Sequence, residues 1–285
     1  MKKILVTGAN GQLGLCLKEQ SNDIKTLDFV FLDSQELDIT NPKQIELVFN
    51  KHNADYCINC AAYTAVDAAE DNKDLAYNIN TLGAKNLAEA CKKYKVTLMH
   101  ISTDFVFDGK GSVPYSEKDK TNPLSVYGAS KLEGENEIMA ILKQYYIIRT
   151  SWLYSKHKSN FVKTMLKLSD DRDELNVVND QKGTPTSALD LADALIRIVK
   201  SKNSCYGIYH YSNTGEATWY DFAKAIFELS NTNIKVNPVP SEAFLTKAKR
   251  PKYSVLDKTK ISTDFNLEIP EWKLSLKTTL NTLNS

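Results

Sequence analysis

The chain has 285 residues and a net charge of +1, because 36 basic residues nearly balance 35 acidic ones. This balance argues against the strongly basic surface that nucleic acids or anionic membranes attract. The length is sufficient for a large core arranged as one or two domains.

Targeting and metal-binding patterns are not found in the sequence. The longest apolar runs are far shorter than a membrane span, and the N-terminal run ends at Thr7, too early for a signal-peptide core. The five cysteines are scattered, as is typical of a reduced protein, and the four histidines show no ligand spacing. We therefore expect a cytoplasmic protein with no membrane segment, no nucleic-acid partner and no metal site.

The first strand, predicted over residues 2–7, runs into a glycine turn. Gly8, Gly11 and Gly14 follow it in the spacing G-x-x-G-x-x-G, and a helical pattern begins directly afterwards. Glycine lets the backbone approach a pyrophosphate, and the N-terminus of a helix presents free N–H groups to it. The order strand, glycine turn, helix therefore predicts a dinucleotide-binding site.

The second predicted strand, residues 27–32, ends at Asp33, about twenty residues beyond the glycine turn. A carboxylate there accepts hydrogen bonds from an adenosine ribose and repels a 2′-phosphate. The following residues, Ser34, Gln35 and Glu36, offer no cation to that phosphate. Asp33 therefore favours NADH over NADPH, although a carboxylate that merely ends a turn is the alternative reading. Asp38 and Ile39 follow, where the adenine could rest.

The third and fourth predicted strands, 56–62 and 96–101, each end in small or polar residues. Ala62, Tyr63 and Thr64 leave the third strand with side chains suited to close cofactor approach. Ser102 and Thr103 leave the fourth, where a hydroxyl can bond a substrate carbonyl. Because ligands of parallel sheets bind at the carboxyl ends of the strands, these residues are candidates for the site.

Tyr127 and Lys131 lie four residues apart in a predicted helix that runs to about residue 142. That spacing places both side chains on one helical face. An ammonium beside a phenol stabilises the phenolate, so Lys131 is expected to lower the pKa of Tyr127 and make it a proton donor near neutral pH. A Y-x-x-x-K pattern alone also occurs by chance on surface helices. The nucleotide turn and the Ser-Thr end of the fourth strand favour the catalytic reading.

The periodicity predicts an α/β fold: a Rossmann-type, doubly wound parallel sheet with a smaller α/β C-terminal substrate domain. Residues 1–150 should form the NAD(P)-binding domain, with about 187–212 packing back onto it, and 151–285 mainly the substrate-binding domain. A long helical run is predicted over 71–93. In the second half we predict helices at 161–168, 189–199 and 219–229, strands at 174–178 and 207–211, a loop at 179–186 and irregular chain over 231–270.

These motifs together resemble the extended short-chain dehydrogenase/reductases and, among them, the dTDP-4-dehydrorhamnose reductases. The resemblance runs nearly end to end. It rests on TGANGQLG at 7–14, NCAAYTAVD at 59–67, STDFVF at 102–107, PLSVYG at 123–128, SKLEGE at 130–135, RTSW at 149–152, NDQ at 179–181 and RP at 250–251.

The resemblance implies an NAD(P)H-dependent reductase that converts the 4-keto group of dTDP-4-dehydro-L-rhamnose to the alcohol of dTDP-L-rhamnose. It implies that Tyr127 protonates the keto oxygen, Lys131 holds the nicotinamide ribose and Thr103 bonds the reacting carbonyl. Asp104 and Trp152 would contact the sugar. The cofactor would lie against the turn and strand-end residues Gly8, Gly11, Gln12, Leu13, Asp33, Asp38, Ile39, Ala62, Tyr63, Thr64 and Ile101, as well as Tyr127 and Lys131.

The resemblance leaves three points open. Some relatives dimerise through Mg²⁺ bound by acidic residues, one of them on the first helix, but here that helix reads Leu15-Cys16-Leu17, so a monomer and a homodimer both remain. A dTDP-4-keto-6-deoxyhexose reductase of different stereochemistry would have the same motifs. A non-catalytic subunit like the regulatory subunit of methionine adenosyltransferase is the third reading, which the intact Thr103, Tyr127 and Lys131 set disfavours.

Overall fold

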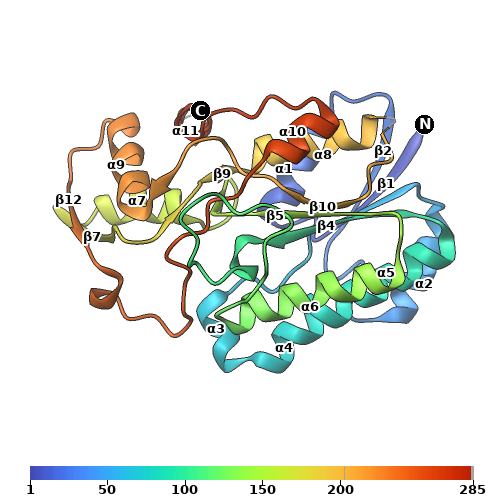
Figure 1. Cartoon of the computed structure of the whole chain (residues 1–285). Helices are drawn as coiled ribbons and strands as arrows, with labels where there is room; N and C mark the ends of the chain where they lie inside the picture. The colour runs from blue at the N-terminus through green and yellow to red at the C-terminus, as the bar shows by residue number, and fades with distance from the viewer. Residues whose placement is uncertain (202, 284–285) are drawn as a thin grey trace.

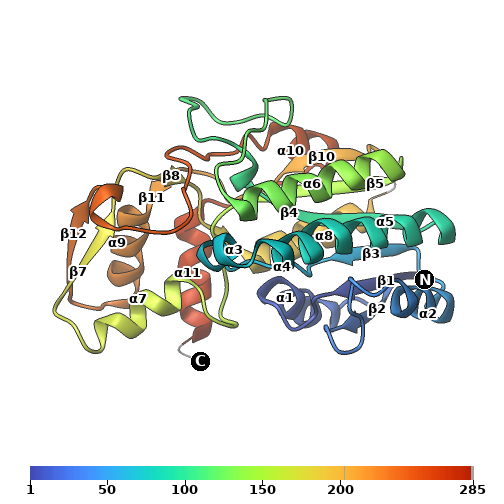
Figure 2. The same ribbon diagram turned by 90° about the horizontal axis from the view of Figure 1, so that it is seen from below.

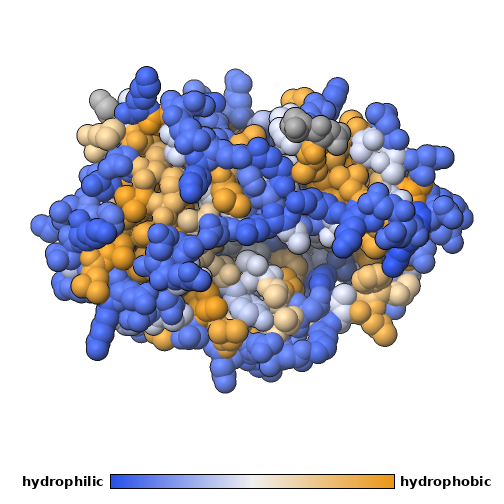
Figure 3. Space-filling view, turned by 180° about the vertical axis from the view of Figure 1, so that it is seen from behind, coloured by the Kyte–Doolittle hydropathy of each residue, from blue (hydrophilic) through white to orange (hydrophobic). Residues whose placement is uncertain are grey.

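The computed structural model describes residues 1–201 and 203–283 of the chain. Its two lobes lie side by side, a large one around a central sheet and a small one around short strands (Figure 1). Within the described residues, every helix is too short or too polar to cross a bilayer. The face seen from behind mixes hydrophilic and hydrophobic side chains (Figure 3).

The large lobe contains a six-stranded sheet in which every strand is parallel to its neighbours. From one edge to the other the strands are β10 (Gly207–His210), β5 (Tyr145–Thr150), β4 (Thr97–Thr103), β3 (Tyr56–Asn59), β1 (Lys2–Thr7) and β2 (Leu27–Leu32). The doubly wound parallel sheet is thereby confirmed. The predicted strand near 207–211 is its sixth member, β10, next to β5.

Helices cover both faces of this sheet, because its strands are apolar on both sides. Ile4 and Val6 of β1 face one hydrophobic cluster, whereas Leu5 between them faces another. The first cluster is covered by α1 (Gln12–Ser21), α8 (Ala188–Lys200) and α10 (Thr259–Phe265), and the second by α2 (Pro42–His52), α5 (Gly83–Tyr94) and α6 (Val126–Ile141) (Figure 1). The sheet is thus the middle of three layers.

The helical run predicted over 71–93 is confirmed over most of its length, but it is interrupted at residue 72 and contains a π-helical turn. The structure has α3 (Val66–Asp71), α4 (Lys73–Tyr77), a π-helical turn η1 (Asn78–Leu82) and then α5. In the π-helical turn the buried Asn80 side chain bonds the backbone N–H and C=O of Tyr63 and the hydroxyl of Ser130. A π-helical turn changes the direction in which a side chain projects, a tertiary requirement that hydrophobic periodicity does not reveal.

The small lobe packs three helices around a two-stranded parallel sheet (Figure 2). The helices are α7 (Phe161–Ser169), α9 (Trp219–Ser230) and α11 (Trp272–Leu283), and the strands are β7 (Glu174–Val178) and β12 (Lys235–Val239). Irregular chain over 231–270 is therefore wrong for β12, for the 3-10 turn η3 (Ser241–Ala243) and for α10. β12 is half-exposed and contains Pro238, so its strand conformation depends on pairing with β7.

Short strands and side-chain contacts connect the two lobes. The loop predicted at 179–186 contains β8 (Lys182–Gly183), which pairs with β11 (Ala217–Thr218). At its end begins β9 (Thr186–Ser187), which pairs with β6 (Leu153–Tyr154). The α8 helix packs against α1, and β10 joins the large sheet, although both come late in the sequence. The domain boundaries at 150 and 187–212 stay predictions.

Candidate active site

A cavity of about 730 Å³ lies at the carboxyl ends of β1, β3, β4 and β5, between the two lobes. Most residues selected from the sequence line it. These are Gly11, Gln12, Leu13, Ala62, Thr64, Ile101, Thr103, Asp104, Tyr127, Lys131 and Trp152. Gly8, Asp33, Asp38, Ile39 and Tyr63 lie outside its lining. Residues far apart in the sequence therefore meet at one end of the sheet.

The glycine turn packs closely against the protein's own backbone at two of its glycines. Gly8 has a φ of +63°, and a Cβ there would lie 2.6 Å from Ala61 N. A Cβ on Gly14 would lie 2.6 Å from Ala9 O. Gly11 is the N-cap of α1 and has no side chain to cap it, and residues 11–14 line the cavity. An uncapped helix N-terminus beside a cavity fits the pyrophosphate of a dinucleotide.

The Gln12 side chain reaches across to the small lobe. Its Oε1 accepts hydrogen bonds of 3.0 Å from Ser155 Oγ and from Asn160 Nδ2. Asn160 also caps α7, because its Oδ1 accepts a hydrogen bond from Lys163 N. The glycine turn and the first helix of the small lobe are therefore held together by one amide.

The two carboxylates selected after β2 bond to their own turns. Asp33 accepts hydrogen bonds from Asn10 Nδ2 at 2.8 Å and from the backbone N–H groups of Gln35 and Glu36. Asp38 accepts two from Thr40. The side chain of Ile39 is buried, in contact with Gly83. Asp33 adjoins the cavity through Asn10, which lines it.

Helix α6 carries Tyr127 and Lys131 and is seated closely on the end of β4. Ser125 caps it by accepting a hydrogen bond from Gly128 N. A Cβ on Gly128 would lie only 2.2 Å from Phe105 O, in the short 3-10 turn η2 (Asp104–Val106). This close approach places the Tyr127 ring edge-on to Phe105, with centroids 5.6 Å apart.

The expected lowering of the Tyr127 pKa is wrong. Burial raises the pKa of Tyr127 to about 12, a hydrogen bond with Thr103 opposes this, and the nearby Asp104 adds to it. Lys131 does not offset the rise. Its own pKa is lowered to about 8 by burial, against the opposing effects of Glu135 and Cys60. Its Nζ donates instead to Ile101 O at 2.7 Å. Desolvation of the buried phenol therefore has a larger effect on its pKa than the nearby Lys131 that the helical spacing predicted.

Asp104 is a buried carboxyl beside the tyrosine. Burial raises the pKa of Asp104 to about 6, although hydrogen bonds from Ser254 and Thr103 oppose the rise. Thr103 Oγ1 donates to Asp104 Oδ1 at 3.1 Å. The three side chains of Thr103, Asp104 and Tyr127 therefore form one polar patch on the cavity wall, able to bond a carbonyl and a neighbouring hydroxyl.

Trp152 lines the cavity together with an aromatic partner, Trp219, that sequence reasoning missed. Its indole stacks on Trp219 with centroids 3.6 Å apart, and its backbone φ is +46°. A Cβ on Gly183 would lie 2.7 Å from the Trp152 ring, so glycine is required beneath it. Phe161 packs against Trp219 at 4.7 Å. Trp219 opens a predicted helix, a position that carries no signal of a ligand site.

Other lining residues were missed as well. They come from the loop before α7 and from the C-terminal half: Lys158, Ser159, Asn160 and Arg250. Arg250 donates to Asp67 Oδ2 at 2.6 Å. The Arg-Pro pair at 250–251 contributes to the family resemblance, which was the one available signal for Arg250.

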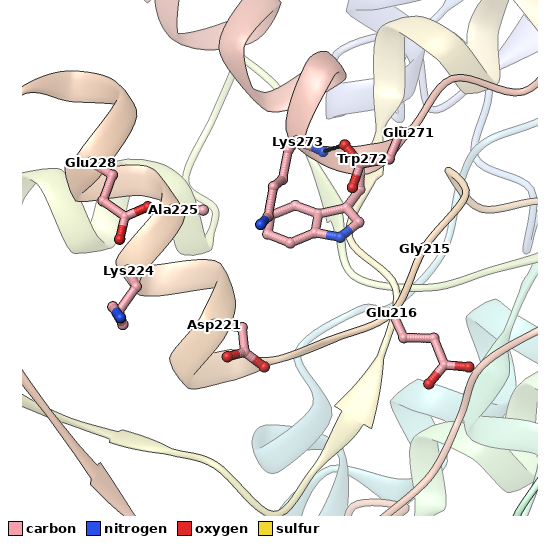
Figure 4. A pocket seen from close by; sticks show the side chains of 9 residues that line it. All are labelled: Gly215, Glu216, Asp221, Lys224, Ala225, Glu228, Glu271, Trp272 and Lys273. Atoms are coloured by element: carbon pink, nitrogen blue, oxygen red, sulfur yellow. Dashed lines mark hydrogen bonds between the residues drawn. The ribbon is translucent and has the colours of Figure 1, made fainter.

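A second cavity, of about 290 Å³, lies in the small lobe between α9 and the start of α11 (Figure 4). Its walls carry charges of both signs, including Asp221, Lys224 and Glu228. It contains none of the residues selected from the sequence. Within residues 1–201 and 203–283, no three His, Cys, Asp or Glu side chains are grouped to bind a metal ion.

Comparison with known proteins identifies the family. All of residues 1–285 match the family described as RmlD substrate binding domain. A dTDP-4-dehydrorhamnose reductase of Aggregatibacter actinomycetemcomitans is 41% identical, over 97% of this chain and 98% of the relative. The chain belongs to the dTDP-4-dehydrorhamnose reductase family. The resemblance predicted from the sequence motifs is confirmed.

Solved structures of this reductase family share the fold. A dTDP-4-dehydrorhamnose reductase of Clostridium acetobutylicum is 46% identical, covers 99% of this chain and 100% of its own, and superimposes with a TM-score of 0.95. The Bacillus anthracis enzyme, in complex with NADP, is 41% identical with the same coverage and a TM-score of 0.94. The Rossmann-type α/β fold is thereby confirmed, and a nicotinamide cofactor is supported.

Proposed function

We propose that this protein reduces the 4-keto group of dTDP-4-dehydro-L-rhamnose to give dTDP-L-rhamnose, using NADH or NADPH. Within the family, the observation that carries the proposal is the meeting of Thr103, Tyr127 and Lys131 in a cavity that also contains the glycine turn. Such a reduction requires three parts: a hydrogen-bond donor to the carbonyl oxygen, a proton donor and a dinucleotide site.

When bound, the dinucleotide supplies the hydride that reduces the carbonyl carbon. The uncapped N-terminus of α1, with Gly11, Gln12 and Leu13, would hold its pyrophosphate. Ala62, Thr64 and Ile101 would line the nicotinamide end of the cleft, and Lys131 would hold the ribose there. These assignments are the ones that the family resemblance implies, and they are supported by the fact that all of these residues line one cavity.

Tyr127 is the proposed proton donor. With a pKa of about 12, above the ordinary tyrosine value of 10, its phenol is protonated near neutral pH and holds the proton to be donated. Thr103, hydrogen-bonded to Tyr127, would hold the carbonyl oxygen beside the phenol. The oxygen then gains one proton from Tyr127 as the carbon gains the hydride, and the product is a secondary alcohol. Asp104 and Trp152 would orient the sugar.

The decisive experiment is product identification by NMR after purified protein has consumed NADH in the presence of dTDP-4-dehydro-L-rhamnose. We expect dTDP-L-rhamnose. A product of different configuration would assign the protein to another dTDP-4-keto-6-deoxyhexose reductase. No turnover with any of these sugars, together with stable binding of a protein partner, would favour the non-catalytic regulatory subunit.

For the cofactor, we propose that Asp33 favours NADH. Its carboxylate lies at the end of β2 among backbone N–H groups and Asn10, beside the cavity. Asp33→Ala removes the negative charge that would repel a 2′-phosphate, so the ratio of kcat/KM for NADH over NADPH should fall by roughly tenfold, equivalent to about 1.4 kcal/mol. Asp23→Ala, on an exposed turn, is the charge-matched control. An unchanged ratio would remove Asp33 from cofactor selection.

A further inference from the structure

Helix α6 carries a third polar residue on the face that holds Tyr127 and Lys131. Glu135 lies four residues beyond Lys131, so the three side chains project from one side of the helix. Tyr127 and Lys131 line the active-site cavity, whereas Glu135 lies outside its lining and is completely buried. The reaction described above gives Glu135 no role.

Glu135 is held by two strands of the central sheet. Arg149 of β5 donates from Nε to Oε1 of Glu135 at 3.0 Å and from Nη2 to Oε2 at 2.6 Å. Ser102 of β4 donates from Oγ to Oε1 at 2.5 Å. Both carboxylate oxygens are therefore bonded, and a two-point contact between a carboxylate and a planar guanidinium fixes how the two groups are oriented.

The other side of Arg149 is fixed as well. His210 Nδ1 lies 2.9 Å from the carbonyl oxygen of Tyr115, which can only accept, so Nδ1 carries the proton. Burial and the nearby Arg149 lower the pKa of His210 to about 3, so the ring is neutral and its Nε2 accepts from Arg149 Nη1 at 3.4 Å. The guanidinium also lies over the Phe107 ring, 5.2 Å from its centroid. The Arg149 side chain therefore cannot move without losing several partners.

The two strand residues that hold Glu135 lie directly before the site. Ser102 and Arg149 are opposite each other in β4 and β5, and the next residues of the two strands are Thr103 and Thr150. Both threonines line the cavity. Glu135 therefore ties α6 to the sheet one residue away from the hydroxyl that is proposed to bond the substrate carbonyl.

Stability alone does not explain a buried ion pair. Taking two charged groups out of water costs free energy that their attraction barely recovers, and apolar side chains of similar volume often stabilise a core equally well. Apolar packing leaves a helix free to slide or rotate slightly, whereas directed hydrogen bonds hold it in one setting. The contacts of Glu135 with Ser102 and Arg149 therefore select a position of α6 more than they stabilise the fold.

We propose that Glu135 and Arg149 are positioning residues that set α6 against the ends of β4 and β5, and so hold the Tyr127 hydroxyl beside Thr103. The proposal deepens the proposed reductase function and rests on it. A misplacement of about 1 Å at an active site can lower a rate roughly hundredfold. Loss of the ion pair should therefore slow the chemical step and leave the binding of NADH and of the sugar largely unchanged.

Two variants separate positioning from stability. Glu135→Gln leaves the Arg149 charge buried without its partner, so the melting temperature should fall by roughly 10 °C and kcat should fall with it. A double variant that combines Glu135→Met with Arg149→Met makes the pair apolar, so its melting temperature should return to near the wild-type value. Its kcat should still be at least roughly tenfold below wild type.

A third variant and a control complete the set. Glu135→Asp keeps the charge but shortens its reach by one methylene group, so it should remain folded and still lose kcat by roughly tenfold. Glu137→Gln removes a carboxylate from the same helix, where it pairs with Lys85 at a partly exposed site, and should leave kcat unchanged.

The kinetic measurements are kcat at saturating NADH and sugar, KM for the sugar, and Kd for NADH by fluorescence titration. Wild-type kcat in the double variant or in Glu135→Asp would overturn the proposal. A loss of NADH affinity as large as the loss of kcat would also overturn it, because the effect would then act through Lys131 and not through the position of Tyr127.

Crystal structures of the double variant and of Glu135→Asp supply a readout that does not need activity. We expect α6 to be displaced relative to β4 and the hydrogen bond between Tyr127 and Thr103 to be lost. An unmoved helix in both structures would overturn the positioning role, whatever the kinetics show. Absence of turnover in the wild type would overturn the proposed function alone, because the structural comparison still tests the positioning of α6.

Discussion

Tyr127 illustrates how burial controls the chemistry of a single side chain. It lies one helical turn from Lys131, but its hydrogen bond is with Thr103, and burial raises its pKa to about 12. The phenol is therefore protonated near neutral pH, as an ordinary tyrosine also is. Lys131, whose pKa burial lowers to about 8, lines the same cavity.

Tyr127→Phe keeps the ring but removes the proton donor. We expect kcat to fall by roughly 10²–10⁴-fold, the usual contribution of general acid catalysis, while NADH affinity changes little. Steady-state kinetics and fluorescence titration with NADH test both parts. Tyr77→Phe, an exposed tyrosine on α4, is the matched control. Near-normal turnover in Tyr127→Phe would mean that another group donates the proton.

Asp104 should make stability depend on pH. Its pKa is raised to about 6 in the folded protein, so its contribution to stability is fully present below its unfolded pKa of 3.8 and is lost as pH rises through 6. The amide of Asp104→Asn cannot ionise, so this variant does not lose stability as the pH rises through 6. Relative to wild type, its unfolding free energy should therefore improve by up to about 3 kcal/mol between pH 4 and 7.5, at about 1.4 kcal/mol per pKa unit.

Urea unfolding of both proteins at the two pH values measures this difference directly. The comparison between pH values cancels any constant cost of replacing the carboxyl by an amide. A difference in unfolding free energy that is the same at pH 4 and 7.5 would show that Asp104 ionises as it does in the unfolded chain.

Among the secondary-structure elements, α6 has the greatest influence on the site. It carries Tyr127 and Lys131, and it approaches the end of β4 so closely that only glycine fits at position 128. Its other contact, at Gly134, brings it against Asn80 O in the π-helical turn. The position of Tyr127 and Lys131 therefore depends on two places where a helix meets backbone without a side chain between them.

Gly128→Ala should displace this helix. The added Cβ would lie 2.2 Å from Phe105 O, and overpacking of this kind costs about 1–3 kcal/mol of stability. We also expect a marked loss of kcat, because Tyr127 would move relative to Thr103. Thermal unfolding and kinetics of Gly128→Ala and of Glu133→Ala, on the exposed face of the same helix, provide the comparison. Equal stability of the two variants would contradict the close-contact explanation.

At the scale of the whole molecule, the cavity depends on contacts that hold the two lobes together. Gln12 of α1 bonds Ser155 and Asn160 on one side. On the other, the segment 247–250 lies against α3: Arg250 bonds Asp67 at 2.6 Å, and Ala248 N donates to Asp67 as well. The sugar would therefore bind between surfaces contributed by both lobes.

Arg250→Ala should loosen one of these contacts. Because Arg250 also lines the cavity, we expect KM for the sugar to rise roughly tenfold, as expected for loss of a hydrogen bond to a charged group. NADH affinity and overall stability should change little, since the ion pair is partly exposed. Lys235→Ala, which breaks an exposed ion pair with Glu174, is the control. An unchanged KM in Arg250→Ala would place the sugar elsewhere.

The strand, glycine turn and helix at the N-terminus and the Tyr127–Lys131 spacing were determined by the sequence itself. Local periodicity and the backbone freedom of glycine encode such features within a few residues. The parallel order of strands followed from their alternation with helices. These patterns, together with the family resemblance, predicted the fold and many of the residues that line the cavity.

Only the tertiary structure decided the environment of each group. It joined Trp152 to Trp219, Arg250 to Asp67 and His100 to Lys131, which are contacts between residues far apart in the chain. It also reversed the expected direction of the Tyr127 pKa shift. The physical reason is that burial and hydrogen-bond direction depend on what packs around a side chain, and helical spacing specifies only which neighbours share its face.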